Sequence, residues 1–136
     1  MKWKISKTAA ANVNFLDYRV DWDKKAPSKI AQHVQDFLKV HCKNYLVLSE
    51  LRIPKSLMRI DYLVPEKNLA IEVNGKGSHE WNPFFMKSRA GFLASIKRDM
   101  KKQEQIELNG FTYIVITDEN LPLTKEFFSS VHDIWL

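Results

Sequence analysis

The segment Met58–Asn74, MRIDYLVPEKNLAIEVN, predicts a tight β-hairpin. Apolar and polar residues alternate on both arms, as in half-buried strands, and Pro65–Asn68 (PEKN) has the composition of a turn. If this loop closes the hairpin, Asp61 on the first arm faces Glu72 on the second. Directly opposed residues have Cβ atoms roughly 4.5–5.5 Å apart, and like charges there are destabilising. The acidic pair therefore indicates a site for a cation.

The preceding segment repeats this pattern. Residues 45–53, YLVLSELRI, are strand-like, and Pro54–Leu57 can form a second turn of the same length. Two such turns align Glu50, Asp61 and Glu72 in a row across three neighbouring antiparallel strands, with mostly apolar residues on the other face. The alternative is that these are three solvated acids without a ligand. Ligands that are all oxygen suit Mg²⁺ or Mn²⁺ better than zinc.

Composition limits the classes of protein to consider. The chain has 136 residues, of which 45% are hydrophobic, so we expect a single domain spanning residues 1–136. The net charge is +5 and the pI is about 9.3, which favours a polyanionic partner, although the lysines could simply be solvated. The single cysteine, Cys42, excludes an internal disulfide and a cysteine-based zinc cluster. Without a signal peptide or membrane-length apolar run, we expect a soluble, cytoplasmic protein with no membrane partner.

The remaining pattern predicts three helices and one more strand. Ser28 is a plausible N-cap for a helix running to about Lys43, and a second helix runs from about Arg89 to Asn109 and ends at Gly110. The apolar run 111–117, FTYIVIT, predicts a buried strand. A last helix, capped by Thr124, has an inward face that we predict to comprise Phe127, Phe128, Val131, Ile134 and Trp135. Residues 1–25 form a basic, aromatic arm that could touch nucleic acid, although packing on the core is favoured.

The predicted fold class is therefore α/β with a mixed, α+β-type sheet. A central sheet containing a three-stranded antiparallel meander is flanked by helices. On the second helix, angular positions counted from Phe92 place Asp99 and Gln103 on the inward stripe with Ile96 and Met100. An inward acid usually has a partner, so Asp99 either bonds to a backbone group or a lysine, or helps to build the acidic site. Gln103 is a secondary candidate for that site.

The loop after the Glu72 strand carries further candidates. Its sequence is GKGSHEWNPFFMK (75–87), and it must leave the strand close to the acids. His79 could act as a general acid or base, or hold a water on the metal. The aromatic residues of the loop could plug the core or stack on nucleic acid.

These residues resemble a known family of nucleases. Asp61, followed after ten residues by Glu72-Val73-Asn74, is similar to the PD-(D/E)XK signature. The strings RIDYLVPEKNLAIEVNGKGSH and RDMKKQEQIELNGFTYIVIT resemble the branch that contains very-short-patch-repair-like endonucleases and the homing endonucleases named for a Glu-Asp-x-His-Asp set. The resemblance covers about residues 46–117 and implies a restriction-endonuclease-like fold with a catalytic core at 45–117. It matches Glu50, Asp61, His79 and Asp99 to that set, in order.

One position departs from the general signature. Asn74 stands where the motif has a lysine, so the positive charge is missing there. On the resemblance, His79 is the residue that we expect to substitute for it. Lys76 has the right parity for this role only if the strand continues through Gly75, and Lys102 lies one turn after Asp99 on the second helix. A site that has lost activity but still binds nucleic acid is the alternative.

The function implied is that of a Mg²⁺- or Mn²⁺-dependent DNA endonuclease, a phosphodiester hydrolase of the homing or repair type. The expected metal ligands are Asp61, Glu72 and Glu50, and the expected catalytic residues also include His79 and Asp99. The residues expected to contact DNA are Arg59, placed opposite Asn74, together with Asn74, Lys76 and Lys102. One site per chain implies either a homodimer that cuts both strands at once or a nickase, and host-defence, repair, mobile-element and phage settings are equally open. A structural or partner-binding protein with an accidental acid row is the third hypothesis.

Overall fold

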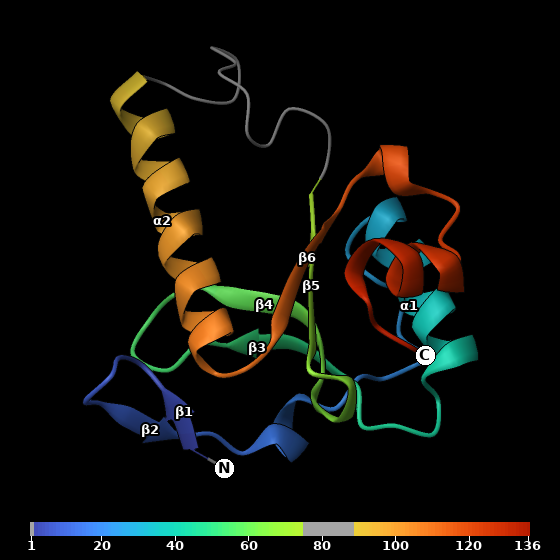
Figure 1. Ribbon diagram of the computed structural model, residues 1–136, viewed down its shortest axis with the longest axis horizontal. Coiled ribbons are helices and arrows are strands. Elements are labelled where there is room, and N and C mark those ends of the chain that lie inside the picture. Colours follow the sequence, from blue (N-terminus) through green and yellow to red (C-terminus); the bar gives the residue numbers. More distant parts are fainter. Residues whose placement is uncertain (1, 75–88) are drawn as a thin grey trace.

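The computed structural model describes residues 2–74 and 89–136, with the backbone alone for Arg89 and Phe92. Its centre is a mixed sheet in the order β3-β4-β5-β6 (Figure 1). The strands are β3 (Leu48–Arg52), β4 (Arg59–Val64), β5 (Leu69–Val73) and β6 (Thr112–Ile116). Strands β3, β4 and β5 form the predicted antiparallel meander, and β6 runs parallel to β5. The mixed α/β class is confirmed.

Both hairpins have the predicted registers. Leu51 pairs with Ile60 across β3 and β4, and Tyr62 pairs with Ile71 across β4 and β5. The second turn is a 3-10 helix at Pro65–Lys67, followed by Asn68 in the left-handed conformation at φ 50°. Asparagine tolerates that conformation better than most residues do. Turn composition was therefore enough to predict the register, although Glu50–Asp61 and Asp61–Glu72 are not among the backbone pairs.

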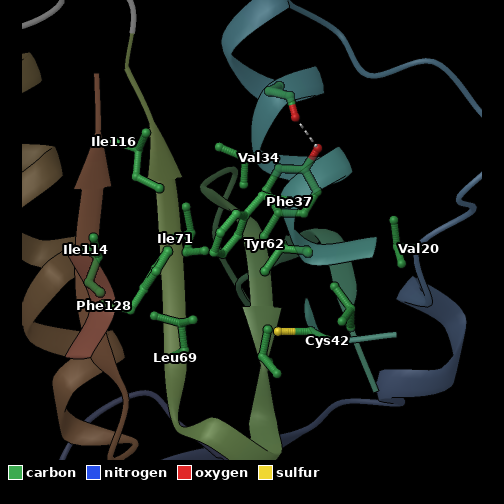
Figure 2. Close-up of a cluster of buried hydrophobic side chains, with 14 of the residues drawn as sticks. Val20, Val34, Phe37, Cys42, Tyr62, Leu69, Ile71, Ile114, Ile116 and Phe128 are labelled. Atoms are coloured by element: carbon green, nitrogen blue, oxygen red, sulfur yellow. Dashed lines mark hydrogen bonds between the residues drawn. The ribbon is translucent and has the colours of Figure 1, made fainter. Parts of the chain in front are cut away.

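Helix α1 (Lys29–His41) covers one face of the sheet together with the C-terminal segment (Figure 1). It begins as predicted, because the Ser28 side chain accepts a hydrogen bond from the Ala31 N–H at 3.1 Å. Figure 2 shows Val34, Phe37, Tyr62, Ile71 and Phe128 in the apolar cluster between the sheet, α1 and the C-terminal segment.

The prediction for the last helix is partly wrong. Phe128 and Ile134 are buried, but Val131 is 66% and Trp135 70% exposed. The helical part is a short π-type turn, Phe127–Val131, so the α-helical spacing of about 3.6 residues does not apply to it. The other short helices are 3-10 turns at Phe15–Tyr18 and Asp118–Asn120. Within the described residues, no helix is both long and apolar enough to cross a membrane.

The opposite face is covered by α2 (Arg89–Leu108) and by a hairpin of β1 (Lys2–Lys4) and β2 (Ala10–Asn12) (Figure 1). Trp3 is 1% exposed, stacks on Phe111 at 6.0 Å between ring centroids, and donates a hydrogen bond to Gln105 at 2.6 Å. The described part of the N-terminal arm therefore packs on the core, as the sequence favoured. Gly110, at φ +86°, ends α2 as predicted.

Helix α2 is rotated relative to the prediction. Lys102 and Ile106 are buried and Asp99 is half-buried, but Gln103 is exposed and donates a hydrogen bond to Glu107. Met100, expected to face inward, is 58% exposed. The inward stripe follows the spacing Asp99, Lys102, Ile106, because an ionic contact rather than an apolar one anchors this part of the helix. The prediction that Gln103 faces the sheet was therefore wrong.

The alternation of side chains between the two faces of the sheet is interrupted at Glu50 and Asp61. Ile60, expected on the same face as Tyr62, lies in the cluster on the α2 side, whereas Tyr62 lies in the cluster on the α1 side. Backbone pairing skips the position where Glu50 would meet Asp61, and Glu50 has a φ of +50°. Both faces of the sheet are therefore covered, and the two acids lie where the buried face changes.

We predict that Trp3→Ala destabilises the whole protein by about 3–5 kcal/mol, because it removes a buried aromatic side chain and a partly buried hydrogen bond. Urea unfolding followed by circular dichroism measures the change. Trp3→Phe is the matched control, because it keeps a ring beside Phe111 and loses the bond to Gln105. An unchanged midpoint for Trp3→Ala would mean that residues 2–12 do not contribute to the cooperative core.

Candidate functional site

Asp61 joins β4 to β5 through its side chain. Its Oδ2 accepts a hydrogen bond from the Val73 N–H at 2.8 Å, just beyond the last backbone pair, Tyr62 with Ile71. The carboxylate thus replaces a backbone partner and is held at the point where the two strands separate. Burial raises the pKa of Asp61, the Val73 N–H and the charge of Lys102 lower it, and the charge of Glu50 raises it.

Glu72 forms a buried ion pair with α2. The Lys102 Nζ lies 2.6 Å from Glu72 Oε2, and the two side chains are 9% and 17% exposed. Burial first, and then the charge of Asp61, raise the pKa of Glu72 to about 7. The charge and hydrogen bond of Lys102 lower it, and the charge of Asp99 raises it. Asp61 and Glu72 therefore share the field of one lysine.

Two further residues adjoin this cluster. Asp99 lies three residues before Lys102 on α2, and its charge acts on both Glu72 and Tyr113. Tyr113, on β6, is half-buried, and burial, followed by the charges of Glu72 and Asp99, raises the pKa of its hydroxyl. That hydroxyl keeps its proton and is available as a donor. The sequence analysis missed Tyr113; the signal was its place in the apolar strand that we predicted to be buried.

Glu50 adjoins Asp61 at a separate cavity. It is exposed and lines a cavity of about 100 Å³ with Asp61, Tyr62, Val73 and the start of α1. Glu72 does not line that cavity but contacts α2. Within residues 2–74 and 89–136, no group of three or more acidic, histidine or cysteine side chains is arranged to hold a metal ion. The structure therefore brings Asp61 and Glu72 together, while Glu50 adjoins Asp61 alone.

The pair Asp61 and Glu72 nevertheless fits a hard divalent cation. Mg²⁺ is usually held by one or two carboxylates, with waters and substrate phosphates completing its coordination. Both carboxyl groups have pKa values raised by burial, and the charge of Asp61 adds to the shift of Glu72. A bound cation would relieve this repulsion. The donor set is oxygen only, as Mg²⁺ or Mn²⁺ requires.

Two residues predicted to contact nucleic acid lie elsewhere than expected. Lys102 is buried against Glu72, so it is not part of an outer surface that could follow a phosphate backbone. Arg59 pairs with Arg52 on β3 and does not face Asn74. By that point β5 has left β4, and the Asn74 N–H donates to the Ile116 carbonyl at 2.9 Å.

His79 and Lys76 lie outside the described residues, so their roles stay predictions. The described ends of the segment that contains them are Asn74, which follows β5, and the start of α2. Asn74 is half-buried. One end therefore adjoins β5, which carries Glu72, and the other is α2, which carries Lys102.

Comparisons of the chain with protein-family models, curated proteins and solved structures find no match. The likeness to the PD-(D/E)XK nucleases therefore rests on the residues themselves.

We predict that Lys102→Met destabilises the protein by about 3 kcal/mol at pH 8, because it leaves the buried Glu72 carboxylate without its cation. Urea unfolding measures the loss. Lys101→Met is the matched control: that lysine is exposed on the same helix, and its removal should cost less than about 0.5 kcal/mol. The double variant Glu72→Gln/Lys102→Met should recover part of the stability. Equal losses in the single and double variants would contradict the ion pair.

Glu72 should make stability depend on pH. Its folded-state pKa, about 7, lies above the ordinary value of 4.5, so the unfolded chain releases this proton first. Stability therefore falls as pH rises from about 4.5 to about 7, by up to about 3 kcal/mol at about 1.4 kcal/mol per pKa unit, and levels off above. Glu72→Gln should remove this component. A difference between the two proteins that is the same at pH 5 and pH 8 would contradict the raised pKa.

Proposed function

We propose that this protein is a metal-dependent DNA endonuclease with a restriction-endonuclease-like, PD-(D/E)XK arrangement. One observation carries the proposal: a buried lysine, Lys102, lies 2.6 Å from Glu72, which is itself beside Asp61 on the neighbouring strand. Two carboxylates and one ammonium in a buried cluster are the groups that the PD-(D/E)XK signature combines. Here the ammonium comes from α2, since the motif position holds Asn74.

Each residue then has a role that its contacts support. Asp61 and Glu72 would hold the divalent cation, which supplies Lewis-acid polarisation of a phosphate oxygen and an activated water. The Val73 N–H fixes the orientation of Asp61. Lys102 places a positive charge where negative charge would develop on the phosphate. Tyr113, held protonated, is a second donor on that side.

The proposed fold is supported by the sheet and its helices. The three-stranded antiparallel meander with a parallel fourth strand is covered by α1 on one face and α2 on the other (Figure 1). Asp61 and Glu72 lie where β4 and β5 diverge, and the lysine ammonium, Lys102, comes from α2. His79 and Asp99 complete the proposed catalytic set, His79 as the group that orients or deprotonates water and Asp99 as its partner or a further ligand.

A second candidate is a catalytically silent DNA-binding module. It is favoured by two observations: Lys102 already neutralises Glu72, and the described residues contain no group of three acids placed around a metal. In that case the cluster would be structural. The proposed enzyme and this module differ in metal binding as well as in cleavage.

We predict that millimolar Mn²⁺ raises the melting temperature of the wild-type protein and that Asp61→Asn and Glu72→Gln abolish the shift. With Mg²⁺ or Mn²⁺ the wild type should nick supercoiled plasmid. Asp61→Asn should slow nicking by about two orders of magnitude or more, because metal assistance is worth several kcal/mol.

Glu66→Gln is the matched control, since Glu66 is an exposed acid in the turn between the same strands. It should bind metal and nick like the wild type. If wild type and Asp61→Asn both retard DNA on a gel yet leave it intact, the silent module is the correct reading. If neither binds DNA at low salt, both candidates are wrong.

A further inference from the structure

The turn between β3 and β4 is a separate cationic element. Residues 51–60, LRIPKSLMRI, contain three basic side chains and no acid. Arg52 and Arg59 occupy directly opposed positions on the two strands, and both are exposed. Lys55, also exposed, lies in the turn that joins them. Each of the three contributes positive charge to the same end of the hairpin.

Opposed like charges on neighbouring strands are destabilising unless something neutralises them. Neither arginine has an ion pair with an acid in the described part of the chain. The Arg52 Nε donates to the Ser56 carbonyl at 3.0 Å, which fixes the side chain without neutralising its charge. The arrangement is therefore one that an external anion would stabilise.

The tip of this hairpin is preformed and carries an apolar residue. The Ile53 N–H donates to the Met58 carbonyl at 2.9 Å, and the Met58 N–H donates to the Ser56 hydroxyl at 2.9 Å. Leu57, between them, is 87% exposed. A large apolar side chain on a hydrogen-bonded turn between cations resembles the wedges that proteins insert between base steps.

The cationic pair is also close in the chain to two acids of the candidate site. Arg52 lies two residues after Glu50 on β3, and Arg59 lies two residues before Asp61 on β4, which corresponds to about 7 Å along each strand. The cationic pair therefore lies on the same two strands as Glu50 and Asp61, two residues away on each strand.

We propose that the β3–β4 hairpin is the element that grips duplex DNA, with Arg52, Lys55 and Arg59 binding backbone phosphates and Leu57 inserting against the bases. The choice of DNA as substrate rests on the proposed function. Charge favours DNA over a protein partner, because the segment offers three cations and no acid, and the one acid among the described residues that lines a cavity with Arg52 and Lys55 is Asp17. Phosphate contacts of this kind position the substrate and carry little sequence information.

The test is duplex-DNA binding by fluorescence anisotropy over a range of salt concentrations, in EDTA, so that no cleavage is involved. The triple variant Arg52→Gln/Lys55→Asn/Arg59→Gln should reduce the slope of log affinity against log salt by about 2–3, at about one per lost phosphate contact. Asparagine is chosen at position 55 because Lys55 has a φ of +58°. Leu57→Ser should weaken binding about tenfold and leave the slope unchanged.

The control is Lys39→Gln/Lys43→Gln/Lys125→Gln, which removes the same charge from exposed positions elsewhere. Circular dichroism establishes that each variant is folded. Equal slopes for the two triple variants would overturn the proposal, as would absence of DNA binding by the wild type at low salt. So would a Leu57→Ser variant that changes oligomeric state in size-exclusion chromatography while binding DNA normally, because that result identifies a protein interface.

The DNA-binding assay and the nicking assay test the two proposals independently. If binding depends on the hairpin but wild type does not nick with Mg²⁺ or Mn²⁺, the hairpin proposal stands and the nuclease proposal falls. If wild type nicks and the triple variant binds like its control, the nuclease stands and the hairpin proposal falls.

Discussion

The ion pair between Lys102 and Glu72 determines how α2 lies on the sheet. A lysine buried at 7% exposure needs a counter-charge, and Glu72 on β5 supplies it at 2.6 Å. This contact rotates the helix so that Asp99 faces the same region and Met100 is left outside. The position of α2 then brings residues from two distant parts of the chain into one buried polar cluster.

That cluster works against the stability of the sheet. Burial raises the pKa of both Asp61 and Glu72, so the folded protein holds acids that would ionise more readily in the unfolded chain. Structural carboxylates usually show the opposite shift, because their partners stabilise the charged form. Shifted carboxylates at the end of a sheet are typical of sites that bind a cation or perform chemistry. The same shifts support the proposal that Asp61 and Glu72 form a cation-binding site.

The local features of the fold could be read from the residues. Turn composition at Pro65–Asn68 predicted the register that brings Asp61 near Glu72, and Ser28 and Gly110 marked helix ends that the structure confirms. These features depend on neighbours in the chain, so periodicity and turn chemistry are sufficient. The break in alternation at Glu50 and Asp61 was not predictable in this way. It depends on which helix covers each face of the sheet.

Local sequence is sufficient to predict the order of the elements, the two hairpin registers and the identity of the acids. Three features depend instead on long-range packing: the lysine that accompanies Glu72, the separation of Glu50 from it, and the opposed arginines left exposed at the hairpin. The reason is that strand pairing depends on short loops, whereas the burial of Lys102 depends on the packing of α2, thirty residues later, against β5. Such contacts depend on which face of a helix packs on which face of the sheet, and one sequence without an alignment does not specify that packing.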